Sequence, residues 1–352
     1  MNEVLVGDAI EKLRELDDKS VQMCCTSPPY YGLRDYGMAG QIGLESTPAE
    51  YIEKVVAVFD EVWRVLRDDG TLWVNLGDTY ATGGGAVGRC PGGGEQGERF
   101  LRQGMINTPP NRMPLDGFKP KDLMMIPARV AIDLQDAGWY LRSDIIWQKS
   151  NCMPESVKDR PTSAHEHIFL FAKSVKYWYD ADAIAEPMSQ EEATRRLRER
   201  REGQGAVYEI ARNGASGKVF GSNSCITNKS ARGEGAVDGF RNARNVWTIP
   251  SQPSTENHYA SFPEELPRRC ILAGCPIGGT VLDPFLGTGT VLAVAKQLGR
   301  KGIGIDLNPN YCEIARKRIA NTPEPLIIVQ PYIKHRRQDC PMETAEQETM
   351  FL

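Results

Sequence analysis

The feature that most constrains the fold of this chain is a glycine-rich turn between two apolar segments, far along the sequence. Residues 279–290 read Gly-Thr-Val-Leu-Asp-Pro-Phe-Leu-Gly-Thr-Gly-Thr. They predict a strand, a tight turn and the start of a helix that continues to Gly299. A second strand, 301–306, follows and closes on Asp306. This βαβ unit predicts parallel strands with ligands at their carboxyl ends.

The spacing of the glycines restricts the ligand that the turn can hold. A dinucleotide fingerprint needs Gly-x-Gly-x-x-Gly, and a phosphate-binding loop needs Gly-Lys-Ser/Thr. Gly287-x-Gly289 is followed by neither a third glycine in register nor a lysine. Asp306 suits ribose hydroxyls, and the carboxylate of Asp283 suits an ammonium or sulfonium group. The pattern favours a nucleoside cofactor with a cationic tail, such as S-adenosyl-L-methionine; a purely structural turn is the alternative.

A second unusual stretch lies near the N-terminus, where the alternating apolar run 21–25 is followed by Thr26-Ser27-Pro28-Pro29-Tyr30. Consecutive prolines lack N–H donors and fix φ, so they predict a rigid corner with free carbonyl acceptors at Ser27 and Pro28. Tyr30 adds a flat face on which a planar ligand can stack. Acceptors beside an aromatic face suit a nucleobase amino group. The alternative is a strand-ending turn with a packing tyrosine.

Taken together, the two segments resemble motifs of one enzyme family. Asp-Pro-Phe-x-Gly-x-Gly-Thr at 283–290 and Thr-Ser-Pro-Pro-Tyr at 26–30 are similar to motifs of the DNA amino-methyltransferases. Their order along the chain resembles the circularly permuted β group of that family. The resemblance covers residues 4–36, 70–78, 121–173 and 258–319. It implies a doubly wound, mostly parallel α/β sheet, S-adenosyl-L-methionine as cofactor and double-stranded DNA as substrate.

The resemblance also implies roles for individual residues. Ser27 and the Pro28 carbonyl are expected to accept hydrogen bonds from the amino group of a flipped-out base. Pro29 belongs to the same corner, and Tyr30 is expected to stack on the base. Asp283, Asp306 and Asp8 are expected to bind the methionine end, the ribose and the adenine amino group of the cofactor. The other expected cofactor contacts are Pro284, Phe285, Gly287, Gly289, Thr290 and, in a segment that closes over the cofactor, Phe262 and Pro263. The reaction that the resemblance implies is expected to need no metal and no covalent intermediate.

The target base depends on the residue before Pro-Pro. Family members that modify adenine usually carry Asp or Asn there, whereas Ser is commoner among cytosine-N4 enzymes, so Ser27 predicts cytosine-N4. Adenine-N6 is the runner-up, because a serine can accept a hydrogen bond from either base. Two further alternatives are a methyltransferase that acts on protein, RNA or a small molecule, and a DNA-binding protein that has lost its activity.

Helix and strand signals place these motifs in an alternating order. Thr47-Pro48-x-Glu50 is a capping box that opens a helix expected to end at Gly70. A strand at 71–76, a helix from Pro127 to Gly138, and strands at 141–147 and 168–172 follow. Strands that alternate with helices predict a doubly wound sheet. Its ligand-binding edge is expected to hold Asp8, Ser27, Asp78, Asp283 and Asp306.

Composition divides the chain into regions. Residues 1–184 are expected to form the catalytic half, with a mobile glycine-rich loop at 82–118, and residues 246–330 the cofactor-binding half. Residues 185–245 form an expected target-recognition insertion, and 331–352 a polar tail. The net charge of −4 is unlike that of a uniformly basic DNA-binding protein, but the second half of the insertion is rich in basic groups. Its expected DNA contacts are Arg212, Lys218, Lys229, Arg232, Arg241 and Arg244; a disordered linker is the alternative.

The remaining composition indicates a soluble cytoplasmic protein. The nine cysteines include no Cys-x-x-Cys pair, so they are expected to be free thiols. The pair His165-x-His167 lacks the further ligands of a metal site. No apolar run approaches the ~18 residues of a membrane span, and the N-terminus lacks a signal peptide pattern. We expect a prokaryotic or phage-encoded monomer or homodimer, with a cognate restriction endonuclease as a candidate partner.

Overall fold

The computed structural model describes residues 2–81, 117–119, 121–152, 154–192, 194–195, 240–252 and 263–323. The main strands are β1 (Asn2–Val6), β2 (Val21–Thr26), β3 (Leu66–Leu76), β4 (Tyr140–Gln148), β5 (His165–Ala172), β8 (Val246–Thr248), β9 (Thr280–Asp283) and β10 (Lys301–Asp306). The helices are α1 (Ala9–Arg14), α2 (Pro48–Val65), α4 (Ile126–Asp136), α6 (Glu265–Gly274), α7 (Thr290–Gln297) and α8 (Pro309–Asn321). Within these ranges no helix is long and apolar enough to cross a bilayer.

These strands form one mixed sheet in the order β1-β10-β9-β2-β3-β5-β4-β8. The first five strands in this order are parallel to one another, and β4 is parallel to β8. β5 runs antiparallel to both β3 and β4. It follows β4 through a loop instead of a long crossover, and such a connection joins antiparallel strands. The predicted doubly wound, mostly parallel sheet is confirmed.

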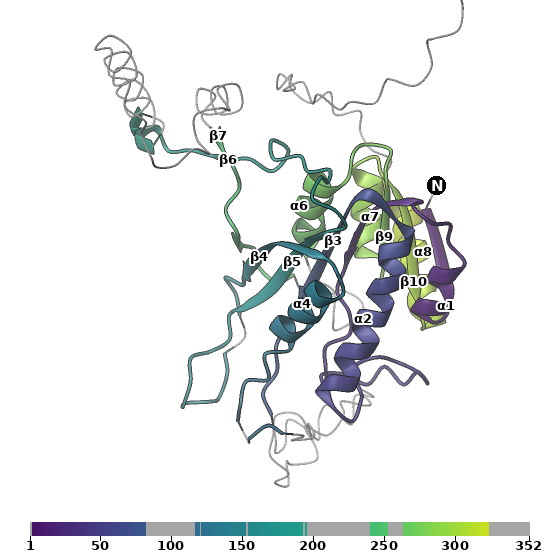
Figure 1. The fold of residues 1–352 in the computed structure, drawn as a ribbon. Coiled ribbons are helices and arrows are strands. Elements are labelled where there is room, and N and C mark those ends of the chain that lie inside the picture. Colours follow the sequence, from purple (N-terminus) through teal and green to yellow (C-terminus); the bar gives the residue numbers. More distant parts are fainter. Residues whose placement is uncertain are drawn as a thin grey trace, which may run out of the picture.

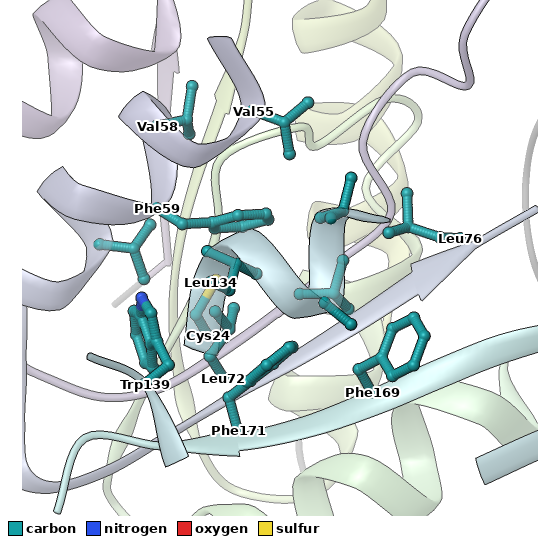
Figure 2. Packing of buried hydrophobic residues seen from close by; sticks show 14 of the residues in the cluster. Cys24, Val55, Val58, Phe59, Leu72, Leu76, Leu134, Trp139, Phe169 and Phe171 are labelled. Atoms are coloured by element: carbon teal, nitrogen blue, oxygen red, sulfur yellow. The ribbon is translucent and has the colours of Figure 1, made fainter. Parts of the chain in front are cut away.

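Both faces of the sheet are covered by helices, so its central strands are apolar on both sides (Figure 1). Successive residues of β2 point to opposite faces: Cys24 belongs to the core under α1, α2 and α4, whereas Met23 and Cys25 belong to the core under α6, α7 and α8. Figure 2 shows the first core, where Phe59 and Leu134 from two helices meet the sheet. All six residues of β2 are buried, which places the strand at the centre of the molecule.

One predicted boundary is wrong. The helix that begins at Pro48 ends at Val65, and β3 starts at Leu66, so Gly70 lies inside a strand and does not end the helix. A Cβ atom at Gly70 would come within 2.9 Å of the Arg67 carbonyl and 3.1 Å of the Gln22 carbonyl. Gly70 is therefore required by the close approach of neighbouring backbones beside an irregular stretch of the β2–β3 pairing.

The ends of the predicted insertion lie side by side. β6 (Glu186–Pro187) pairs antiparallel with β7 (Phe240–Arg241) in a separate two-stranded sheet, which stands away from the main sheet (Figure 1). The chain rejoins the main sheet at β8, where Trp147 and Trp247 are paired in register. The expected glycine-rich loop and polar tail lie almost wholly outside the described residues, and the division into functional regions stays a prediction.

Candidate active site

A cleft of about 950 Å³ opens at the carboxyl ends of the parallel strands. It brings together residues from both ends of the chain that the sequence singled out. They are Asp8, Ser27, Pro28, Pro29, Tyr30, Pro263, Asp283, Pro284, Phe285, Gly287, Thr290 and Asp306. The proline corner after β2 and the glycine-rich turn after β9 therefore open into one space.

Asp283 ends β9 at the base of this cleft and is 2% exposed. Its Oδ1 accepts hydrogen bonds from the Thr26 hydroxyl at 2.6 Å and from the Phe285 N–H at 3.1 Å. Burial raises the pKa of Asp283 to about 7, although these two bonds oppose the shift. A buried carboxylate of this kind gains most from a cationic ligand, which would replace the lost solvation of its charge.

Asp306 ends β10 and fixes the turn that follows β9. Its Oδ2 accepts from the Gly287 N–H at 2.8 Å, and its Oδ1 accepts from the Asn308 N–H at 2.8 Å. Burial raises the pKa of this carboxyl to about 6. Asp306 thus holds the glycine-rich turn against β10 and presents its carboxylate in the cleft.

Two further expected cofactor residues, Gly289 and Asp8, have clear structural roles. Gly289 does not line the cleft. It precedes α7 with φ 81°, and an added Cβ would lie 2.9 Å from the Cβ of Ala315, so only glycine fits between the turn and α8. Asp8 lines the cleft and caps α1, where its Oδ1 accepts from the N–H groups of Ile10 and Glu11 at 2.9 and 3.1 Å. Because both bonds use one oxygen, capping is compatible with ligand binding.

The proline corner is fixed from behind by α2. The hydroxyl of the buried Tyr51 donates to the Pro29 carbonyl at 2.9 Å. Tyr30 is packed against the core, and its hydroxyl lies at the centre of a polar network. Burial, followed by the charge of Glu166, raises the pKa of Tyr30 well above its ordinary value. Tyr30 therefore stays neutral and keeps its hydroxyl proton.

Sequence reasoning missed this network, which joins Tyr30 to Asn75, Glu166 and Lys149. The Tyr30 hydroxyl donates to Glu166 Oε2 at 2.6 Å, and Asn75 Nδ2 donates to the same oxygen at 3.1 Å. Lys149 forms an ion pair with Glu166 Oε1, and its ammonium lies 4.7 Å from the centre of the Trp147 ring. The side chains of Glu166 and Lys149 are only 14% and 23% exposed. A signal was available for Asn75, which is a polar residue in the apolar, buried end of β3. Glu166 gave no such signal, because it stands between His165 and His167 at the polar start of β5.

We expect a Gly77→Ala substitution to lower catalysis by displacing Tyr30. A Cβ at this position would lie 2.6 Å from Cε2 and 3.0 Å from Cδ2 of the Tyr30 ring, so the ring must move. The turnover number should fall while affinity for a cofactor bound at Asp283 stays the same, as separate titrations would show. The matched control is the Tyr30→Ala background, in which Gly77→Ala should have no further effect; an equal loss in that background would contradict the explanation.

The structure changes the interpretation of several predicted residues. Asp78 was expected at the ligand-binding edge, but it does not line the cleft and instead caps α4, with its Oδ1 accepting from Ile126 N–H at 3.0 Å. This bond is needed because Met125, the residue before the helix, provides no side-chain cap. Phe262, Arg212, Lys218, Lys229 and Arg232 lie outside the described residues.

Arg241 and Arg244 were expected to contact DNA, and in the structure both are paired with acidic residues. Arg241 pairs with Glu192 at 2.5 Å and with Glu186 at 3.3 Å, and Arg244 pairs with Glu186 at 2.9 Å. The sequence argument considered only the second half of the insertion, whereas these two acids lie in its first half. Arg241 is 19% exposed, whereas Arg244 is 67% exposed. Arg241 therefore joins the two ends of the insertion through its ion pairs with Glu186 and Glu192. Most of the Arg244 side chain is exposed to solvent.

Comparisons with known proteins agree on one family. The profile of the DNA methylases that modify N6 or N4 positions matches residues 21–317. The type II methyltransferase M.SmaI from Serratia marcescens is 41% identical over 316 residues, 90% of each chain. The type II methyltransferase M.Cfr9I from Citrobacter freundii is 43% identical over 313 residues, 89% of this chain and 86% of that one.

Solved structures show the same fold. The cytosine-N4-specific PvuII DNA methyltransferase superposes with a TM-score of 0.57 at 19% identity, over 90% of this chain and 86% of that one. A structure described as a DNA modification methylase from Thermus thermophilus, complexed with S-adenosyl-L-methionine, superposes with a TM-score of 0.54 at 21% identity, over 92% of this chain and 95% of that one.

Proposed function

Because the chain belongs to the N6/N4 DNA methylase family and is therefore a DNA methyltransferase, we propose that it moves a methyl group from S-adenosyl-L-methionine to the N4 amino nitrogen of a cytosine in double-stranded DNA. The observation that carries this proposal is the shared cleft. The proline corner, which suits a nucleobase amino group, and the two buried carboxylates, which suit a cationic nucleoside, line the same space.

The donor set of the cleft fits S-adenosyl-L-methionine. Asp283 is a buried carboxylate with a raised pKa, and it would hold the ammonium group of the methionine end. Asp306 would accept the ribose hydroxyls, and Asp8 the adenine amino group. Phe285 and Pro263 add apolar surface to the same cleft. When bound, the cofactor supplies an electrophilic methyl group on a sulfonium centre.

The residues of the corner prepare the nucleophile. The lone pair of a cytosine amino nitrogen is delocalised into the ring, so the nitrogen attacks poorly until it becomes pyramidal. Ser27 and the Pro28 carbonyl would accept the amino hydrogens, which would localise that lone pair. Tyr30 offers its ring to a base that has left the duplex. Positioning of this kind supplies much of the rate of a bimolecular transfer.

The choice of cytosine rests on Ser27 and is supported by one likeness. The fold neighbour with the higher TM-score is named as cytosine-N4-specific, whereas the family as a whole includes both N6 and N4 enzymes and does not distinguish the two bases. Adenine-N6 is the alternative. Incubation with S-adenosyl-L-methionine and DNA, followed by mass spectrometry of the nucleosides, decides between them: N4-methylcytosine supports the proposal, and N6-methyladenine overturns the choice of base.

The proposal extends to the partners of the enzyme. The relatives are named as type II methyltransferases, which supports a cognate restriction endonuclease with the same recognition sequence. A monomer or homodimer in a prokaryotic or phage-derived cytoplasm stays our expectation. We propose residues 185–245 as the target-recognition region, because β6 and β7 bring its two ends together outside the main sheet.

We expect an Arg244→Ala substitution to weaken DNA binding and to reduce its salt dependence. Arg244 is exposed near the base of the insertion. Its guanidinium can bind a DNA phosphate while it stays paired with Glu186. Loss of one phosphate contact should lower the slope of log affinity against log salt by about one unit. Cofactor affinity should stay the same. Lys317→Ala is the matched control, since Lys317 is a 70% exposed, ion-paired residue of α8; an equal change in both variants would contradict a specific role for Arg244.

A further inference from the structure

Arg34 is a cationic residue with a hydrogen-bond donor that finds no acceptor in the described part of the protein. It follows the proline corner by four residues and lines the cleft. Its Nη1 atom is buried, yet it has no hydrogen-bond partner within the described part of the chain. A guanidinium stays charged and carries five N–H donors. A buried donor without an acceptor is costly, so such an atom beside a ligand cleft indicates an acceptor on the ligand.

The loop that carries Arg34 is held in a defined shape. The side chain of Gln41 donates from Nε2 to the Arg34 carbonyl at 3.1 Å and accepts at Oε1 from the Tyr36 N–H at 2.8 Å. At the base of the loop, the Gly32 N–H donates to the Gly43 carbonyl at 2.7 Å. These bonds fix the backbone on both sides of Arg34, so its place beside the cleft does not depend on a freely moving segment.

The groups around Arg34 do not neutralise it. Its side chain donates to the Tyr36 hydroxyl, and its charge lowers the pKa of Tyr36 against the larger effect of burial, which raises it. Tyr311 packs edge-on to Tyr36, with ring centroids 6.4 Å apart. Burial raises the pKa of Tyr311, and the charge of Asp306 adds to this shift while the charge of Arg34 opposes it. Within the described residues Arg34 forms no ion pair, and its neighbours in the cleft are mainly aromatic or already bonded.

We propose that Arg34 is an anion-binding residue of the cleft and that it binds an oxyanion of a reactant. The inference rests on the proposed function, which brings two such oxyanions to this place. One is the carboxylate of the cofactor's methionine end, next to the ammonium expected at Asp283. The other is a DNA phosphate beside the nucleotide that enters the corner. A planar guanidinium binds either group with two parallel N–H···O bonds.

The experiment compares Arg34→Gln and Arg34→Lys with wild type, with Arg142→Gln as control. Arg142 is a surface arginine that contacts Tyr177 and does not line the cleft. Calorimetry measures binding of S-adenosyl-L-methionine and of its decarboxylated analogue. Fluorescence anisotropy measures binding of a DNA duplex that contains the sequence the enzyme methylates. In further duplexes, the phosphates that flank the target base are replaced one at a time by a neutral methylphosphonate.

If the partner is the cofactor carboxylate, Arg34→Gln should bind S-adenosyl-L-methionine at least tenfold more weakly and should bind the decarboxylated analogue as wild type does. If the partner is a phosphate, Arg34→Gln should lose at least tenfold in DNA affinity, and one methylphosphonate should remove the difference from wild type. In either case Arg34→Lys should restore part of the loss, because it keeps the charge.

Wild-type affinity of Arg34→Gln for both ligands would overturn the proposal. So would an equal loss for the charged and neutral forms of both ligands, which would assign Arg34 a structural role. Failure of the proposed function is distinguishable from these outcomes: wild-type protein would then methylate no DNA, whereas the comparison of the two cofactor forms would still report on Arg34.

Discussion

An Asp283→Asn variant should bind S-adenosyl-L-methionine at least about 100-fold more weakly than the wild-type enzyme at pH 8. The variant keeps the Oδ1 acceptor used by Thr26 and Phe285, so the change removes the charge and leaves the local bonds in place. Loss of one partner of a buried ion pair costs about 3–5 kcal/mol, and each 1.4 kcal/mol corresponds to about tenfold in affinity. Isothermal calorimetry on both proteins measures the difference directly.

The same substitution should remove a pH dependence. With a pKa of about 7, Asp283 is mostly protonated at pH 6 and mostly ionised at pH 8. Affinity of the wild-type enzyme for a cationic cofactor should therefore rise between these values and level off above them. The variant should show no rise from this source. Equal affinity of the two proteins at pH 8 would refute the assignment of Asp283 to the cofactor.

Thermal unfolding provides the control for this variant. The folded-state pKa of Asp283 lies above its ordinary value of about 3.9. Between about pH 4 and pH 7 the folded protein thus binds more protons than the unfolded chain, and this carboxyl lowers the free energy of unfolding as the pH rises. An amide does not ionise. The variant should be at least as stable as wild type at pH 8, which separates lost binding from lost folding.

A Tyr30→Ala variant should lose tenfold or more in turnover while its affinity for the cofactor stays within about twofold of wild type. Stacking of one base on an aromatic ring contributes about 1–3 kcal/mol, and each 1.36 kcal/mol changes a rate about tenfold. Single-turnover methyl transfer with saturating cofactor and DNA measures the chemical step. If cofactor affinity fell and the transfer rate survived, Tyr30 would belong to the cofactor pocket instead.

Tyr30→Phe and Glu166→Gln separate the ring from its anchoring. Tyr30→Phe keeps the stacking face and removes the 2.6 Å bond to Glu166, so its rate loss should be smaller than that of Tyr30→Ala. Glu166→Gln removes the negative charge that pairs with Lys149. If Glu166 acts by positioning Tyr30, the double variant should be no slower than the worse single variant. Additive losses would show that Glu166 acts independently of Tyr30.

Much of the architecture could be predicted because it is encoded locally. The run 21–25 is apolar apart from Gln22 and is buried on both faces, which marks a central strand. The turn after β9 carries its glycines at positions where φ is positive or backbones meet, as at Gly289. The corner at Ser27 shows its rigidity in its own prolines. Each of these signals depends on neighbours within a few residues.

What could not be predicted depends on contacts between distant segments. Tyr30 and Glu166 are separated by 136 positions, and Asn75 and Glu166 by 91. Their meeting requires β5 to lie antiparallel beside β3, which no pattern within either strand specifies. Gly70 was misassigned for a related reason: the backbones that require it come partly from β2, 48 residues earlier. Arg241 found its partner in Glu186 across the whole insertion.

The bond between Thr26 and Asp283 spans 257 positions of the chain, and this separation has a consequence for the timing of synthesis. A ribosome adds about 5–20 residues per second, so about 13–50 seconds pass between the emergence of the proline corner and the completion of the turn that faces it. During that time β2 lacks its neighbour β9, and β1 lacks β10. A nascent or prematurely terminated chain has the proline corner but lacks the glycine-rich turn that completes the cleft, so we expect it not to modify DNA. Only a chain translated through Asp306 can acquire activity, so chains that end before this residue are expected to have no methyltransferase activity.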